Sequence, residues 1–169
     1  MNLIQQDDFF SNLNFILPEI KKIKLHTPQE YNKINKIYNT WPGYRSLVLS
    51  NIHPILHEYI VSLMTNKKLI PPGEWMIQSM IHLITENSVN NWIHKDIEHD
   101  YSGLIYISNT NLNSGTYLYN DNQEIINDIK FVQNRFIMYN AKTYHMGYGH
   151  HGSSIDDGRL TVNLFLNKL

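Results

Sequence analysis

The chain has 169 residues, with 14 Lys and Arg against 15 Asp and Glu, so its formal net charge is −1. This length suits a single domain over residues 1–169, and so small a charge gives no strong field for a polyanion such as nucleic acid. The absence of cysteine excludes disulfides, thiolate metal sites and a cysteine nucleophile. Because nine histidines are present, a metal in this protein is expected to be held by imidazole and carboxylate.

The sequence also predicts where the protein works. It contains no apolar stretch near the roughly 20 residues that span a bilayer, and the N-terminus MNLIQQDDFF has no signal-peptide pattern. We therefore expect no membrane association and a cytoplasmic location. The excess of Asn and Ile is typical of an AT-rich genome, in a bacterium or in a phage that acts in its host cytoplasm. The oligomeric state stays open.

Residues 1–70 are predicted to form a mostly helical N-terminal cover. Apolar residues recur at near-helical spacing over 12–25 and again over 53–64. Between these segments, 41–46 reads as a turn. Three histidines of this part are expected to be solvated or to cap helices: His26, His53 and His57.

Residues 71–169 are predicted to form a β core. Alternating side chains over 74–85 indicate a long strand. Shorter strands are expected over 103–108, 116–119, 130–133, 135–139 and 159–167. Polar turns separate these strands, including 109–115 and 147–158. The fold class is therefore mainly β with N-terminal helices, as a sandwich, jelly roll or barrel.

The segment from Trp92 to Asp96 carries a candidate metal site. In an extended or turning backbone, the side chains of His94 and Asp96 lie on the same side and can reach one ion. A third ligand from a distant strand would complete a facial triad of two histidines and one carboxylate, which favours Fe(II). His-x-Asp alone is a weak signal, because such a tripeptide is common in a histidine-rich chain.

The later part of the chain supplies the remaining groups in the right order. His145 follows a predicted strand and a short turn. In the last strand Arg159 and Thr161 share one face. A buried arginine with a hydroxyl nearby suits the carboxylate of a co-substrate, whereas the plainer reading of Arg159 is a surface ion pair with Asp156 or Asp157.

With these residues, the chain resembles 2-oxoglutarate and Fe(II)-dependent oxygenases of the prolyl-4-hydroxylase-like group, in particular short members from bacteria and phages. The resemblance covers essentially the whole chain, through 7–10, 41–46, 92–96, 103–108, 114–116, 134–145 and 158–165. It implies a double-stranded β-helix, a cupin-like jelly roll, with a metal between its sheets.

The resemblance also implies roles for particular residues. His94, Asp96 and His145 would bind Fe(II), while Arg159, Thr161 and Tyr106 would hold the far carboxylate of 2-oxoglutarate. The implied reaction consumes O2 and 2-oxoglutarate and releases succinate and CO2 as a substrate is hydroxylated, with ascorbate as a further reductant. The presence of Asp96 favours hydroxylation over halogenation, since related halogenases lack this carboxylate.

The distal histidine requires a choice between neighbours. In the family, the distal histidine lies fewer than fourteen residues before the basic residue that binds the co-substrate. Here fourteen residues separate His145 from Arg159. His150 and His151 lie nearer to Arg159. We choose His145, because it follows the strand directly, and treat 147–158 as an insertion.

Other readings stay open. A cupin-like metal protein with a 2-oxoglutarate-independent activity would not need Arg159 and Thr161. A non-catalytic phage accessory module would need none of the site. A phosphohydrolase built on His99 and Asp100 is disfavoured, because that pair lies in a loop. Met80, Trp92 and Phe165 either line a pocket or pack in the core. The substrate is expected to be a peptidyl or free amino-acid side chain or another small molecule.

Overall fold

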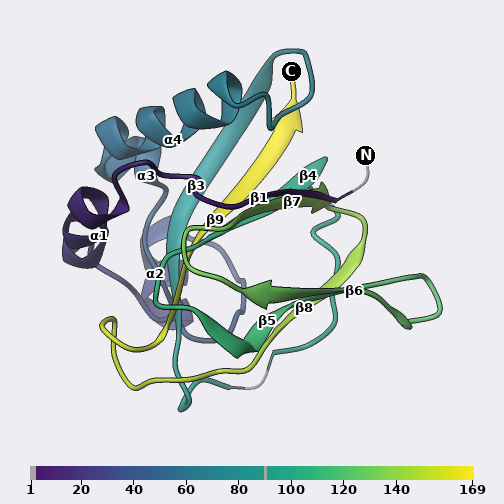
Figure 1. Ribbon diagram of the computed structural model, residues 1–169. Helices are drawn as coiled ribbons and strands as arrows, with labels where there is room; N and C mark the ends of the chain where they lie inside the picture. Colours follow the sequence, from purple (N-terminus) through teal and green to yellow (C-terminus); the bar gives the residue numbers. More distant parts are fainter. Residues whose placement is uncertain (1–2, 90) are drawn as a thin grey trace.

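The computed structural model describes residues 3–89 and 91–169, and Figure 1 shows its elements in chain order. The helices in this part are α1 (Leu13–Lys22), α2 (Pro28–Asn35), α3 (Leu49–Ile52) and α4 (Pro54–Asn66). The strands are β1 (Ile4–Gln6), β2 (Tyr44–Arg45), β3 (Trp75–Ile84), β4 (Tyr101–Tyr106), β5 (Asn111–Tyr119), β6 (Ile125–Phe131), β7 (Phe136–Asn140), β8 (Tyr144–Tyr148) and β9 (Arg159–Lys168). None of the described helices has the length and apolar character needed to cross a membrane.

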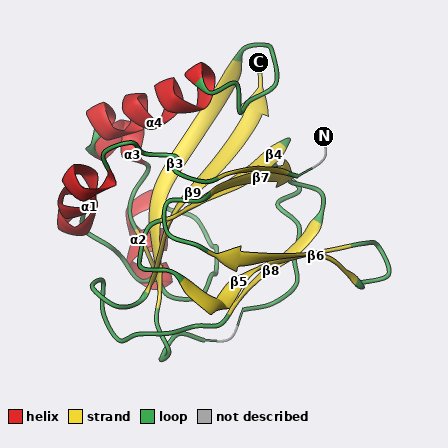
Figure 2. Ribbon diagram, viewed as in Figure 1, coloured by secondary structure: helices red, strands yellow, loops and turns green. Residues whose placement is uncertain are grey.

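The strands form two antiparallel sheets. The larger sheet has the order β1-β7-β4-β9-β3-β2, and the smaller one has the order β6-β5-β8. Helices α1, α3 and α4 lie on one side of the larger sheet, and the smaller sheet lies on the other (Figure 2). The arrangement confirms the predicted fold class, which is mainly β with N-terminal helices.

The alternation of side chains along β9 divides the protein into two interiors. Leu160, Val162, Leu164 and Leu166 are fully buried and belong to the core that the larger sheet shares with the helices. The other face of β9, which includes Arg159 and Asn163, points toward the smaller sheet. Since each fully buried aliphatic side chain contributes about 1.5–3 kcal/mol, the helix-facing row holds β9 in register.

A second core lies between the two sheets and is smaller. It contains buried side chains from β4, β5, β6 and β7, namely Tyr106, Leu118, Ile129, Phe131, Ile137 and Tyr139. These residues fill only part of the space between the sheets. The rest of that space forms the cavity described below.

The predicted elements and the observed ones differ in several places. The predicted turn over 109–115 contains the first half of β5, and the strand expected over 130–133 begins earlier, as β6. Helix α2 and strand β8 were not predicted. Helix α2 begins with a capping box in which Thr27 and Glu30 bond to each other's backbone N–H groups, a local signal that the apolar pattern does not contain.

The three N-terminal histidines differ in their surroundings. His53 caps α4 as expected, because its Nδ1 accepts a hydrogen bond from the Leu56 N–H at 3.3 Å. The expectation of solvated or capping roles is wrong for His26 and His57, which are both buried. His57 Nδ1 lies 2.8 Å from the Ser79 hydroxyl, so its polar edge is satisfied inside the protein.

The core between helices and sheet predicts a large effect for Phe136→Ala. Phe136 is fully buried, and its ring stacks on Phe9 with 5.3 Å between centroids. Truncation should lower the free energy of unfolding by about 3–5 kcal/mol, measured by urea denaturation. The matched control is Phe15→Ala, at a side chain that is 81% exposed, with an expected change within about 0.5 kcal/mol. Equal losses in both variants would contradict this account of the core.

Candidate metal centre and its cavity

Two histidines from distant parts of the chain lie side by side. The His94 N–H donates to the His145 carbonyl at 3.0 Å, and the His145 N–H donates to the His94 carbonyl at 2.9 Å. This isolated antiparallel bridge joins the loop before β4 to strand β8 of the smaller sheet. The imidazole centroids are 4.3 Å apart as a result.

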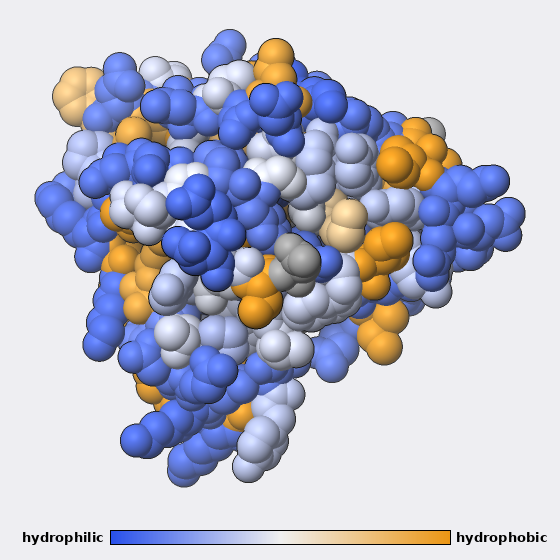
Figure 3. Space-filling view, turned by 90° about the horizontal axis from the view of Figure 1, so that it is seen from below, coloured by the Kyte–Doolittle hydropathy of each residue, from blue (hydrophilic) through white to orange (hydrophobic). Residues whose placement is uncertain are grey.

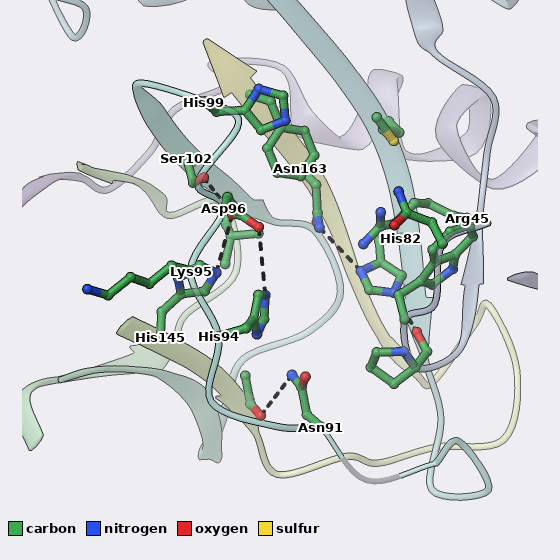
Figure 4. Close-up of a pocket in the computed structure, with 18 of the residues that line it drawn as sticks. Arg45, His82, Asn91, His94, Lys95, Asp96, His99, Ser102, His145 and Asn163 are labelled. Carbon is green, nitrogen blue, oxygen red and sulfur yellow. Dashed lines mark hydrogen bonds and ion pairs between the residues drawn. The ribbon is translucent and has the colours of Figure 1, made fainter. Parts of the chain in front are cut away.

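Asp96 completes a cluster with these histidines (Figure 4). Its backbone N–H donates to the Ala141 carbonyl at 2.9 Å. One carboxylate oxygen lies 3.3 Å from His145 Nε2, and the other lies 3.8 Å from His94 Nε2. The Ser102 hydroxyl donates to the carboxylate at 2.6 Å. One ligand atom from each of His94, Asp96 and His145 lies within 4.8 Å of the other two.

The second nitrogen of each histidine fixes its orientation. His94 Nδ1 lies 2.9 Å from the Trp92 carbonyl, and His145 Nδ1 lies 3.0 Å from the Thr143 carbonyl. Since carbonyls only accept, Nδ1 carries the proton in both rings and Nε2 keeps its lone pair. Such backbone partners commonly orient metal-binding histidines. Two imidazole Nε2 atoms and one carboxylate match the donor set of a facial Fe(II) triad.

The protonation states suit metal binding at neutral pH. Burial by itself would raise the pKa of Asp96, but the adjacent imidazoles of His145 and His94 and the hydrogen bond that Ser102 donates bring this pKa to about 2. Burial, together with His145, lowers the pKa of His94 below its usual 6.5. Both groups are therefore in the form that binds a cation, a carboxylate and a neutral imidazole.

The cluster opens into a cavity of about 570 Å³ between the two sheets. Arg45 and His82 line it from adjacent strands, where they pair directly. Thr161 and Tyr106 continue the same row across the larger sheet, because His82 pairs with Thr161 and Thr161 with Tyr106. Residues directly opposite one another on adjacent strands point to the same face. Met80, Trp92 and Phe165, for which the sequence left pocket lining and core packing open, also border the cavity.

Arg159 is buried at the start of β9 and borders the same cavity. Its Nη2 donates to the Gly115 carbonyl at 3.1 Å and to the Thr116 hydroxyl at 3.3 Å. Its Nε has no hydrogen-bond partner among the residues that the structure describes. The alternative for Arg159, a surface ion pair with Asp156 or Asp157, is absent among the described residues. Asp156 pairs instead with Lys21 at 2.7 Å. An arginine buried without a carboxylate is suited to an anionic ligand.

Tyr106 and Thr161, the other two residues predicted to bind 2-oxoglutarate, lie near Arg159 and make different contacts. Tyr106 is fully buried, and its hydroxyl donates to the Thr116 hydroxyl at 2.8 Å. Thr161 donates to Asn163 Oδ1 at 2.7 Å, so its hydroxyl is directed to Asn163. Thr116 was missed by sequence reasoning, although it lies between Tyr106 and Arg159. A single threonine in a strand carries no pattern that would mark it.

The two other candidates for the distal ligand are separate from this cluster. His150 and His151 follow β8 and belong to no group of potential metal ligands found among the described residues. His151 Nδ1 lies 2.9 Å from the Gly149 carbonyl, and its ring meets Phe131 edge-on. The structure therefore brings His145, and neither of these two, to His94 and Asp96.

Comparison with known proteins shows the fold. No protein-family model matches the chain, and no curated protein matches it. A 2OG-Fe(II) oxygenase family oxidoreductase from Burkholderia pseudomallei superposes with a TM-score of 0.65 at 9% identity, over 98% of this chain and 84% of that one. A Pseudomonas putida prolyl-4-hydroxylase gives 0.57 at 10% identity, over 99% and 92%. IDO from Bacillus thuringiensis gives 0.60 at 15% identity, over 98% and 89%.

These similarities, with the triad in place, define a class of fold. The chain has the double-stranded β-helix that prolyl 4-hydroxylases and other 2-oxoglutarate and Fe(II)-dependent oxygenases share. At 9–15% sequence identity, these structural similarities are evidence for the fold alone. The activity has to be argued from the residues of the site.

The triad predicts opposite results for two histidine variants. Replacing His145 with alanine removes one of three ligands, so Fe(II) affinity should fall by more than the roughly 10–100-fold typical of losing a partner behind a ligand. Replacing His150 with alanine should leave the affinity unchanged. Anaerobic Fe(II) titration of both variants measures this, with circular dichroism to establish that each is folded. Loss of Fe(II) binding in the His150 variant alone would identify His150, and not His145, as the third metal ligand.

Proposed function

We propose that this protein is an Fe(II)- and 2-oxoglutarate-dependent dioxygenase. It would hydroxylate a small molecule or an amino-acid side chain, free or in a peptide, with release of succinate and CO2. The observation that carries the proposal is the convergence of His94, Asp96 and His145, with both Nε2 atoms free, on a cavity that also contains the buried Arg159.

In this proposal His94, Asp96 and His145 hold Fe(II), which supplies O2 activation when bound. Their part is to hold three ligand atoms on one side of the ion and to leave the cavity side open. The Ser102 hydroxyl occupies one lone pair of the Asp96 carboxylate and restrains its rotation. The backbone carbonyls behind both imidazoles restrain them in the same way.

Arg159 would bind the far carboxylate of 2-oxoglutarate. A guanidinium and a carboxylate form a pair of parallel charge-assisted hydrogen bonds, and burial strengthens them. The hydroxyls of Tyr106 and Thr116 lie beside this guanidinium and can rotate to donate to the same carboxylate. The Thr161 hydroxyl already donates to Asn163, so it would reach the carboxylate of 2-oxoglutarate directly only by turning away from that amide.

The first test is spectroscopic and enzymatic. Anaerobic protein with Fe(II) and 2-oxoglutarate should show a weak visible charge-transfer band, since the co-substrate chelates the ion. On admission of air, succinate should form without an added substrate, slowly, in an amount that depends on Fe(II). The His145→Ala protein is the control and should show neither signal. A wild-type protein that binds Fe(II) but shows no band would contradict the proposal.

A second prediction concerns Arg159→Ala. Losing a charged hydrogen-bonding group costs about 1.5–3 kcal/mol, so the affinity for 2-oxoglutarate should fall roughly 10- to 150-fold while Fe(II) binding is kept. The band described above, followed during titration with 2-oxoglutarate, measures both quantities. Arg135→Ala, which breaks a pair with Asp7 outside the cavity, is the matched control. Unchanged affinity in the Arg159 variant would favour the cupin-like alternative.

A further inference from the structure

The cavity contains a second arginine, Arg45, that the proposed chemistry does not use. It comes from β2 at the edge of the larger sheet and lies across the cavity from His94 and Asp96 (Figure 4). Its guanidinium carbon lies 4.5 Å from the centre of the Trp41 ring. Within residues 3–89 and 91–169, its side chain makes no hydrogen bond or ion pair, and its Nε is fully enclosed. The Trp41 indole N–H is likewise buried without an acceptor there.

The turn before β2 holds Arg45 in this position. Gly43 has a φ of +76°, and a Cβ there would lie 2.1 Å from the Leu83 carbonyl oxygen, so the turn approaches β3 as only glycine permits. The backbone of Arg45 exchanges two hydrogen bonds of 2.8 Å with His26. A side chain with an anchored backbone that stacks on an indole is held in place before any ligand arrives.

The polar groups around Arg45 are already paired with one another. His82 Nε2 lies 2.7 Å from the Pro42 carbonyl, and its Nδ1 lies 3.3 Å from the Asn163 amide nitrogen. The amide oxygen of Asn163 accepts the Thr161 hydroxyl. Burial, followed by Arg45, lowers the pKa of His82 well below 6.5, so this imidazole is neutral. None of these groups supplies a negative charge to Arg45.

The charges of the side chains that line the cavity do not balance: Arg159 is buried, while Arg45 and Asp96 are half-buried. Arg45 and Arg159 are positive, and burial lowers the pKa of Arg45 only to about 10, against the opposing effect of Asp96. Asp96 is negative. Of the charged residues at the cavity rim, Lys95 pairs with Asp121 at 3.2 Å and Glu98 is exposed. The sum inside is +1, and Fe(II) with the dianion of 2-oxoglutarate leaves it at +1. An uncompensated charge that is partly withdrawn from water is costly, and the Nε of Arg45 is enclosed without a partner among the described residues, so a further anion is favoured.

We infer that the substrate to be hydroxylated carries a carboxylate, and that Arg45, stacked on Trp41, binds this carboxylate across the cavity from the metal centre. The inference rests on the proposed function for the occupants of the triad and of Arg159. Arg45 would then be the specificity-determining residue, because it selects an anionic substrate and sets which carbon faces the metal.

The size of the cavity favours a small acid, such as a free amino acid, over a protein segment. About 570 Å³ is within the roughly 300–1,000 Å³ of small-molecule sites, and 2-oxoglutarate would share it. The face of the molecule shown in Figure 3 is mostly hydrophilic, with hydrophobic residues in separate small groups. That face therefore offers no broad apolar surface to a protein partner.

The test compares acids with their amides. The indole N–H signals of protein loaded with Zn(II) and 2-oxoglutarate are followed by NMR during titration with acetate, propanoate, L-alanine and L-proline, and with the four corresponding carboxamides. The Trp41 signal is assigned with Trp41→Phe. At millimolar concentration at least one acid should shift this signal and bind at least tenfold more tightly than its amide.

The variant Arg45→Gln should reduce that acid-to-amide ratio to about one, and Arg45→Lys should restore part of it. Because the ratio is taken within one protein, a general loss of stability does not change its meaning. Arg135→Gln carries the same substitution outside the cavity and should keep the wild-type ratio. The signals shifted by 2-oxoglutarate should respond in the Arg45 variants as in wild type.

Three outcomes overturn the inference: no acid shifts the Trp41 signal, the amides bind as tightly as the acids, or the ratio survives in Arg45→Gln. Failure of the proposed function has a different signature. In that case 2-oxoglutarate causes no shift of its own, whereas acids still shift the Trp41 signal in an Arg45-dependent way.

Discussion

The pair of backbone hydrogen bonds between His94 and His145 is the contact on which the candidate site depends. These residues come from different parts of the chain, and this bridge connects the loop that contains Asp96 to the smaller sheet. A hydrogen bond of 3.2 Å from the Asn91 amide to the Gly147 carbonyl supports the same connection. A bridge pairs backbones directly, so its two side chains emerge close together on one side. The two imidazoles therefore meet without any direct bond between the rings, and the third ligand is supplied by the next turn of the same loop.

The larger sheet supplies the other side of the cavity, because successive side chains along its strands point to opposite faces. On β3 and β9 one set of residues packs on the helices, and the alternate set faces the cavity. The apolar set determines the register, because a slip of one residue would expose it to the cavity and bury the polar set against the helices. Stabilisation of the core thus positions Arg159 and His82, which make no apolar contribution themselves.

The sequence allowed the fold class to be predicted from alternation over 74–85 and 159–167, since long two-faced strands have the clearest pattern. Strand β8 was not predicted, because it is short and carries polar and apolar residues without regular alternation. His57 and His26 were misjudged for a related reason. Their burial depends on Ser79 and on the pairing with Arg45, which are contacts between segments that sequence spacing does not reveal.

The site was predictable where its residues share one segment, as in His94-x-Asp96, and less so where the fold brings segments together. The turn at 41–46 was visible in the sequence, but the place of Arg45 opposite Asp96 follows only from the pairing of β2 with β3. Thr116 meets Tyr106 and Arg159 across the gap between the sheets. A role for Arg45 or Thr116 could not be inferred from the composition of the chain or from the alternation of side chains along its strands.

The scarcity of arginine has a physical meaning in this structure. The chain has three arginines, and Arg135 pairs with Asp7 outside the cavity. The other two, Arg45 and Arg159, border one cavity, and neither has a carboxylate partner among the described residues. Lysine would be a poorer choice at both places, because its ammonium is more strongly hydrated and lacks the planar fork that grips a carboxylate. Removing a guanidinium from water is costly, and a carboxylate bound at each arginine, as proposed above, would offset that cost. Because both guanidiniums border one cavity, an anion bound at either arginine would lower the repulsion that the other experiences, so the two proposed anion sites would be electrostatically coupled.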